Sequence, residues 1–123
     1  MPESTAREVA LSKIKMGDIF HAANKQGTTS LICLATSITE TTIHARTVTH
    51  GLEFMFDRLT GVGKELEYSM SGTIDSVAPL PPDIYDALMS LDLKRQNWDG
   101  PLSEEQKRAL IFVSYFYPEN PID

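Results

Sequence analysis

The apolar residues of this 123-residue chain change their spacing near residue 79. Before that point they recur mostly at every second position, which is the period of a β-strand. After it they recur at every third or fourth position, which is the period of an α-helix. The change falls at Pro79-Leu80-Pro81-Pro82, where proline removes backbone donors and disfavours helix in the residue before it. The pattern therefore predicts a β-rich part, residues 9–78, followed by a helical part, residues 79–123.

Three segments of the first part have a clear strand signature. Residues 29–38 are apolar on both faces and rich in β-branched side chains, which is typical of a central strand. Residues 42–48 and 52–59 alternate instead, and the second of these places Phe54 and Phe56 on one face. Because strand side chains point alternately to opposite faces, we expect these two phenylalanines to be buried together.

Residues 65–77 show the most regular alternation in the chain and are predicted to form one bent strand or two short ones. Leu66, Tyr68 and Met70 would face the core, while Glu65 on the opposite face would be in contact with water. Residues 1–8 are polar, and we expect them to be frayed.

The first predicted helix begins at Pro82, because proline is tolerated in the first turn of a helix. Its apolar residues Ile84, Leu88 and Leu91 have the i, i+4, i+7 spacing of a buried stripe. This spacing predicts an amphipathic helix that packs its apolar face on the sheet.

The second predicted helix begins after Ser103, which has the spacing of a capping box with Gln106. Its body, residues 109–117, is apolar almost all round, so we expect it to be largely enclosed. Pro118 is expected to end it.

The predicted fold class is α+β, in a single domain that spans residues 1–123. Short loops favour antiparallel neighbours, because a parallel crossover needs a dozen or more residues. We expect five or six mostly antiparallel strands in a curled sheet or half-barrel, followed by two C-terminal helices. The segment Lys15-Met16-Gly17-Asp18-Ile19-Phe20 resembles the first strand of small Src-homology and KOW-type barrels. That resemblance covers six residues, and we derive no function from it.

Composition favours a small protein of the cytoplasm. We expect its source to be a bacterial cell or a phage, although no motif indicates this. The one cysteine, Cys33, cannot form an internal disulfide. No apolar stretch approaches the ~20 residues that span a bilayer, and residues 1–5 lack the basic start and apolar stretch of a secretory signal. We therefore expect no membrane association, and the sequence does not indicate an oligomeric state.

No pattern of residues predicts a catalytic, cofactor or metal site. His44 and His50 are separated by six positions with a glycine just beyond, and Cys33 lies in an apolar run that favours an inert core thiol. Glu65 would be on a wet strand face, which does not raise a carboxyl pKa. Residues 60–64 contain two glycines and a lysine but lack the spacing of a phosphate loop. We therefore expect a non-enzymatic protein without cofactor or metal.

The favoured function is binding to another protein, as an inhibitor, immunity or adaptor protein does. The helical part carries eight Asp or Glu residues against four Lys or Arg, within a net charge of −6 for the chain. An acidic surface favours a basic partner. Tyrosine and tryptophan are favoured at interface centres, so the candidate surface consists of Trp98, Tyr115, Phe116 and Tyr117.

The alternative is a nucleic-acid-binding module. Residues 13–64 carry six Lys or Arg against four Asp or Glu, and phenylalanines and a tyrosine lie near these cations in the sequence. Surfaces that bind single strands combine cations with exposed aromatic rings. The candidate residues are His44, Arg46, Arg58 and Lys64, on a strand surface around the two arginines.

Overall fold

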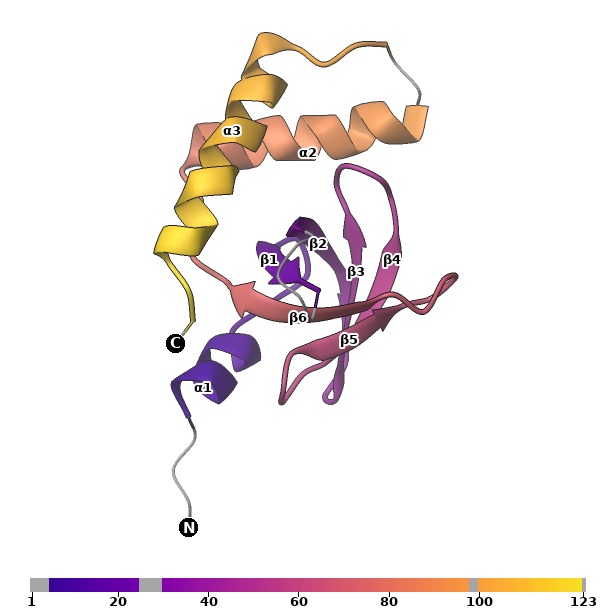
Figure 1. Ribbon diagram of the computed structural model, residues 1–123, viewed down its shortest axis with the longest axis vertical. Helices are drawn as coiled ribbons and strands as arrows, with labels where there is room; N and C mark the ends of the chain where they lie inside the picture. Colours follow the sequence, from indigo (N-terminus) through magenta and orange to yellow (C-terminus); the bar gives the residue numbers. More distant parts are fainter. Residues whose placement is uncertain (1–4, 25–29, 98–99, 123) are drawn as a thin grey trace.

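Six antiparallel strands form a closed barrel in the computed structural model, which describes residues 5–24, 30–97 and 100–122. Each strand pairs with the next along the chain, and the first also pairs with the last. The helices α2 and α3 lie together at one end of the barrel and α1 lies at the other (Figure 1). The elements are α1 (Ala6–Ser12), β1 (Ile19–Ala23), β2 (Ser30–Ile38), β3 (Thr42–Thr47), β4 (Glu53–Asp57), β5 (Val62–Glu65), β6 (Ser71–Ser76), α2 (Pro82–Asn97) and α3 (Glu104–Glu119).

The predicted fold class is confirmed, since strands are followed by two C-terminal helices in an α+β arrangement. The sheet closes completely where a curled sheet or half-barrel was expected. Closure pairs the edges that an open sheet would leave exposed. Strand faces in β3 and β4 are also as predicted, with Phe54 and Phe56 both fully buried.

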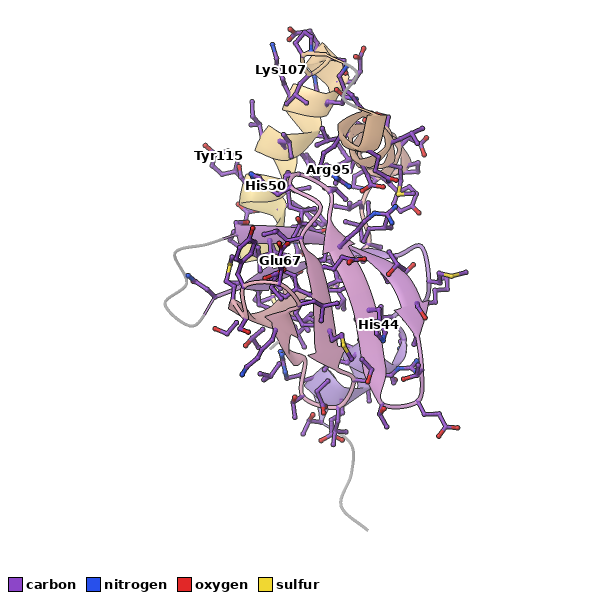
Figure 2. The ribbon with its side chains drawn as sticks, turned by 90° about the vertical axis from the view of Figure 1, so that its right-hand side faces the viewer. His44, His50, Glu67, Arg95, Lys107 and Tyr115 are labelled. Carbon is purple, nitrogen blue, oxygen red and sulfur yellow. The ribbon has the colours of Figure 1, made fainter. Side chains whose placement is uncertain are left out.

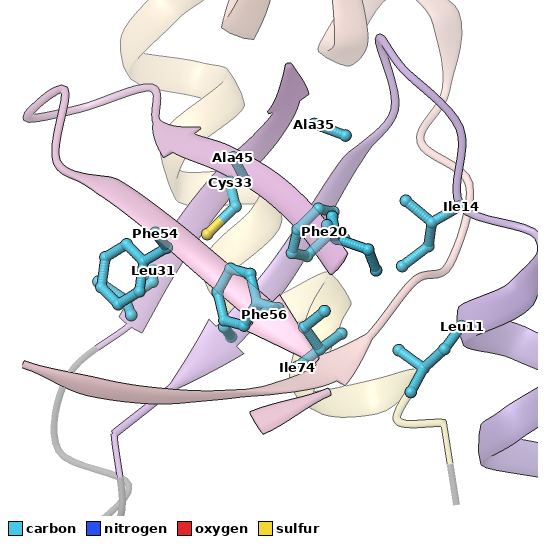
Figure 3. Packing of buried hydrophobic residues seen from close by; sticks show 12 residues of the cluster. Leu11, Ile14, Phe20, Leu31, Cys33, Ala35, Ala45, Phe54, Phe56 and Ile74 are labelled. Atoms are coloured by element: carbon cyan, nitrogen blue, oxygen red, sulfur yellow. The ribbon is translucent and has the colours of Figure 1, made fainter. Parts of the chain in front are cut away.

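The strand β2 belongs to two cores at once. Its side chains Leu31 and Cys33 point into the barrel, whereas Ile32 and Leu34 point outward and are covered by α2 and α3. Figure 3 shows the barrel interior, where the stacked rings of Phe54 and Phe56 lie 5.4 Å apart between centroids. This double role explains why residues 29–38 are apolar on both faces.

The helix α1 was not predicted, and the expectation that residues 1–8 are frayed is wrong for residues 6–8. Thr5 caps the helix, because its side-chain oxygen accepts a hydrogen bond of 3.0 Å from the backbone N–H of Glu8. Leu11 and Ile14 then join the core cluster inside the barrel. A short polar segment is thus ordered by one cap and two apolar contacts.

The prediction of one bent strand or two short ones over residues 65–77 is confirmed only for residues 71–76, and the expectation that Glu65 faces water is wrong. The strand β5 ends at Glu65, β6 begins at Ser71, and a turn connects them. The Glu65 carboxylate is buried and accepts hydrogen bonds from the backbone N–H groups of Glu67, at 2.8 Å, and Tyr68. The inward-facing Glu65 carboxylate thus provides the hydrogen-bond acceptors for the backbone N–H groups of the turn. The side chains of Leu66 and Tyr68 project into solvent instead.

Both C-terminal helices begin as predicted. Ile84, Leu88 and Leu91 are buried on α2. At the start of α3, the Ser103 hydroxyl accepts from the Gln106 N–H at 3.1 Å, and the Gln106 side chain accepts from the Ser103 N–H at 2.8 Å. The capping box is therefore confirmed.

The end of α3 returns the chain to the barrel. The helix continues through Pro118 for one more residue, so the expected stop at that proline is wrong. Beyond the helix, the Asn120 carbonyl accepts from the Ser76 hydroxyl at 2.6 Å, and the Ile122 N–H donates to the Asp75 carbonyl at 2.9 Å. These bonds attach the C-terminal residues to β6.

Residues 60–64, the glycine-containing segment, lead into β5 and pack against β4. A Cβ atom at Gly63 would lie 2.9 Å from the Cα of Phe56 and would also collide with the Met55 carbonyl oxygen. A Cβ at Gly72 would meet only side-chain atoms, of which the end of Leu31, at 3.2 Å, is the nearest, followed by the rings of Phe54 and Phe56 at 3.4 and 3.8 Å. Glycine at position 63 therefore permits the close approach of two backbones.

Substitution of Gly63 by alanine is expected to lower the free energy of unfolding by about 1–3 kcal/mol, because the β4 backbone must move. The matched variant Gly72→Ala should lose less than about 1 kcal/mol, since a side-chain methyl group can shift. Urea denaturation of both variants measures the difference. Equal losses would contradict the proposed backbone contact.

Candidate functional site

A buried cluster of charges fixes α2 on the barrel. The Asp92 side chain, 4% exposed, accepts hydrogen bonds from Arg46 of β3 at 3.0 and 2.8 Å. It also accepts from Arg95 at 3.1 Å and from Gln96 at 2.9 Å. Such a two-pronged arginine–carboxylate pair is geometrically specific. The cluster therefore sets the position of α2 relative to β3.

The electrostatics of this cluster favour its charged state. Burial alone would raise the pKa of Asp92, but the hydrogen bonds and charges of Arg46 and Arg95 outweigh that effect and hold the pKa below its ordinary value. The hydrogen bonds to Asp92 also raise the pKa of Arg46. Each group thus stabilises the ionised form of the other.

Neither arginine of the predicted nucleic-acid surface projects freely into solvent. Arg46 is held by Asp92, and Arg58 donates to the backbone carbonyls of Thr39 and Ser12, each at 3.0 Å. The two arginines also lie at opposite ends of the β3–β4 ladder. Arg46 pairs with Glu53 and Arg58 is five residues further along, about 17 Å away at ~3.3 Å per residue. They do not form one cationic surface.

His44 and Lys64, the other two residues of that set, are brought together. Both are cross-strand neighbours of Met55, so β3, β4 and β5 present them in one row on the outer face of the barrel. Figure 2 shows His44 on this strand face, well separated from Tyr115 on α3. Nucleic-acid binding by this face stays a prediction.

The helix α3 divides the predicted aromatic surface. Tyr117 is buried on its inner side, so it belongs to the core and to no exposed surface. Tyr115 is 69% exposed and Ile111, one turn earlier, is 62% exposed. The expectation that residues 109–117 are largely enclosed is therefore wrong for the outer side of the helix. Trp98 lies outside the described residues.

Two partly buried rings border these exposed side chains. Phe112 and Phe116 stack on each other with centroids 5.2 Å apart, and both pack against the core beneath the helices. We call Ile111, Phe112, Tyr115 and Phe116 the α3 apolar face. Figure 2 shows Tyr115 pointing away from the barrel. Ile111 and Tyr115 share the i, i+4 spacing of the buried Ala109, Val113 and Tyr117, so the spacing alone does not identify the exposed face.

Acidic side chains predominate among the exposed charges on α2 and α3. Lys107 is paired with Glu104 at 3.5 Å, which leaves Arg108 with no ion pair among the described residues. The exposed acidic residues are Asp83, Asp86, Glu104, Glu105 and Glu119, against Lys107 and Arg108.

A second arrangement, which the sequence did not reveal, lies on the outer wall of the barrel. His21 is 8% exposed, and its ring packs against that of Tyr117 of α3, with centroids 5.3 Å apart. Its Nδ1 lies 2.6 Å from the Asp75 carboxylate and its Nε2 lies 2.5 Å from the Ser30 hydroxyl. Asp75, His21 and Ser30 come from β6, β1 and β2, and only barrel closure places them side by side.

Elsewhere in the described part of the chain, the His50 Nδ1 lies 2.9 Å from the Thr49 hydroxyl. Within the described residues, no three His, Cys, Asp or Glu side chains converge to hold a metal ion. Cys33 is fully buried, and burial raises the pKa of its thiol. In the same part of the chain, none of the helices is both long and apolar enough to cross a bilayer.

Removal of the central carboxylate tests the charge cluster. Asp92→Ala should reduce the free energy of unfolding by about 3 kcal/mol, because it leaves two half-buried arginines unpaired. Glu104→Ala, which breaks an exposed pair, should cost less than about 0.5 kcal/mol. Chemical denaturation measures both variants, and a small loss at Asp92 would contradict the structural role of the cluster.

The cluster should also give stability a defined pH dependence. The lowered pKa of Asp92 means that its contribution is complete above the ordinary carboxyl pKa of ~3.9 and is lost as the pH falls toward the folded-state value. The stability difference between the wild type and Asp92→Asn should therefore be smaller at about pH 3 than at about pH 7. Urea unfolding at the two pH values tests this, and an unchanged difference would disprove it.

Comparison with known proteins does not assign the chain to a family. No family model, curated protein sequence or solved structure matches it. Its function must therefore be inferred from the geometry of its own residues.

Proposed function

We propose that this protein is a small binding module whose α3 apolar face contacts another protein. The observation that carries the proposal is the exposure of Ile111 and Tyr115 on a helix whose opposite side is already fully packed. Ala109, Val113 and Tyr117 attach the helix to the rest of the molecule. The outward apolar side chains are therefore not needed for that attachment, and their continuity with Phe112 and Phe116 supports a role in binding.

The chemistry of the face suggests the chemistry of its partner. Tyrosine combines a large apolar surface with a hydroxyl group and is favoured at the centre of interfaces. The acidic excess on α2 and α3, together with the net charge of −6, favours a partner with basic residues around an apolar pocket. A cytoplasmic inhibitor, immunity or adaptor protein of a bacterial cell or phage would bind in this way.

Site-specific photo-crosslinking provides a direct test. A benzophenone amino acid at position 115, introduced in the cells that naturally produce the chain, should form an adduct with a basic protein. The same amino acid at position 68 should not, although Tyr68 has the same exposed fraction of 69%. Tyr68 lies in the turn between β5 and β6, which is on the far side of the molecule from α3 (Figure 1).

A second substitution links the adduct to the apolar face. Ile111→Asp should reduce the yield at position 115 at least tenfold, because it places a charge in the contact, while circular dichroism shows an unchanged fold. Mass spectrometry identifies the crosslinked protein, and the sequence of that protein shows whether it is basic. Equal adducts at both positions, or recovery of nucleic acid in place of protein, would contradict the proposal.

A further inference from the structure

We propose that Ser30 is a nucleophile that His21 and Asp75 activate, and that it reacts with small carboxylic esters. This activity is independent of the proposed protein binding. The three side chains are hydrogen-bonded in the order carboxylate, imidazole, hydroxyl, with distances of 2.6 and 2.5 Å. A triad of this type is recognised by its geometry and not by its position in the sequence.

The order of the contacts determines the tautomer of the imidazole. An ionised carboxylate only accepts hydrogen bonds, so the proton of neutral His21 resides on Nδ1, facing Asp75. The other nitrogen, Nε2, is then free to accept the proton of the Ser30 hydroxyl. This is the tautomer that a general base needs when it activates a serine.

The surroundings orient the base and leave the nucleophile accessible. His21 is held between β2 and β6 and lies against the Tyr117 ring, whereas Ser30 is exposed. Asp75 is fixed by its strand and by the backbone bond from Ile122. The base is therefore buried, and the exposed hydroxyl that it contacts can be reached by a molecule from solution.

The reaction would proceed in two balanced steps. As Ser30 Oγ bonds to the carbonyl carbon of the ester, its proton passes to His21 Nε2. The bond to the leaving oxygen then breaks, and Nε2 returns the proton to that oxygen, which departs as an alcohol or phenol. Water next bonds to the acyl carbon and gives one proton to Nε2. The bond between that carbon and Ser30 Oγ then breaks, Oγ takes the proton from Nε2, and a carboxylic acid is released. Asp75 stabilises the imidazolium that exists between these transfers.

The substrate class follows from what the three residues supply. Loss of one oxyanion-binding donor lowers the rate of a serine hydrolase about 10²–10³-fold. The proposal relies on Ser30, His21 and Asp75 alone and includes no oxyanion-binding donor. It therefore favours substrates with good leaving groups, such as phenyl esters, over amides.

Labelling with a phosphonofluoridate tests the nucleophile in the full-length protein. Ser30 Oγ should bond to phosphorus as fluoride leaves, and peptide mass spectrometry should locate the group at Ser30. The matched control is Ser37, which is also exposed and lies on the same strand. We expect Ser30 to be labelled at least tenfold faster than Ser37, and unfolding in urea should abolish the difference.

Two variants distinguish activation from simple exposure. Ser30→Ala should remove the label and also reduce 4-nitrophenyl acetate hydrolysis to that of free amino acids. The Asp75 side chain is half-exposed, and asparagine has the same size. Asp75→Asn should therefore slow labelling at Ser30 at least tenfold while the circular dichroism spectrum remains unchanged. Equal labelling of Ser30 and Ser37, no labelling, or an unchanged rate in Asp75→Asn would overturn the proposal.

Discussion

The pairing of β1 with β6 is the interaction on which the other features of this protein depend. It joins residues such as His21 and Ser76 that are distant in the sequence, and it encloses the phenylalanines of the barrel core. It also places Asp75 beside His21 and provides the strand to which the chain after α3 returns. Without this pairing, the sheet would have two open edges, and the hydrogen bond between Asp75 and His21 on the outer wall would be lost.

Hydrophobic periodicity predicted the parts of the fold in which burial alone decides the structure. The alternation in β3 and β4 identified Phe54 and Phe56 as core residues, and the stripe on α2 was equally clear. The same reasoning failed at Glu65. There the local hydrogen bonds of a carboxylate to a turn compete with the alternation of apolar residues and reverse which side chains are buried.

The candidate sites were harder to predict because their residues are far apart in the sequence. Tyr115 was identified from its type, but the exposure of Ile111 required knowledge of which side of α3 faces the barrel. Arg46 was expected in a cationic surface, and its partner Asp92 lies 46 positions later. Only the strand register and the docking of α2 reveal that this charge is already paired.

The order of the strands has a consequence for how the chain folds. Every neighbouring pair except one forms between consecutive segments, so each hairpin can assemble with a short loop to close. The remaining pair, β1 with β6, must bring together segments between which all the other strands lie in the sequence. Its formation therefore costs the most chain entropy. We therefore expect the barrel to form hairpin by hairpin, with the pairing of β1 and β6 as its slow last step. The helix α3 and the residues after it then dock onto the closed barrel.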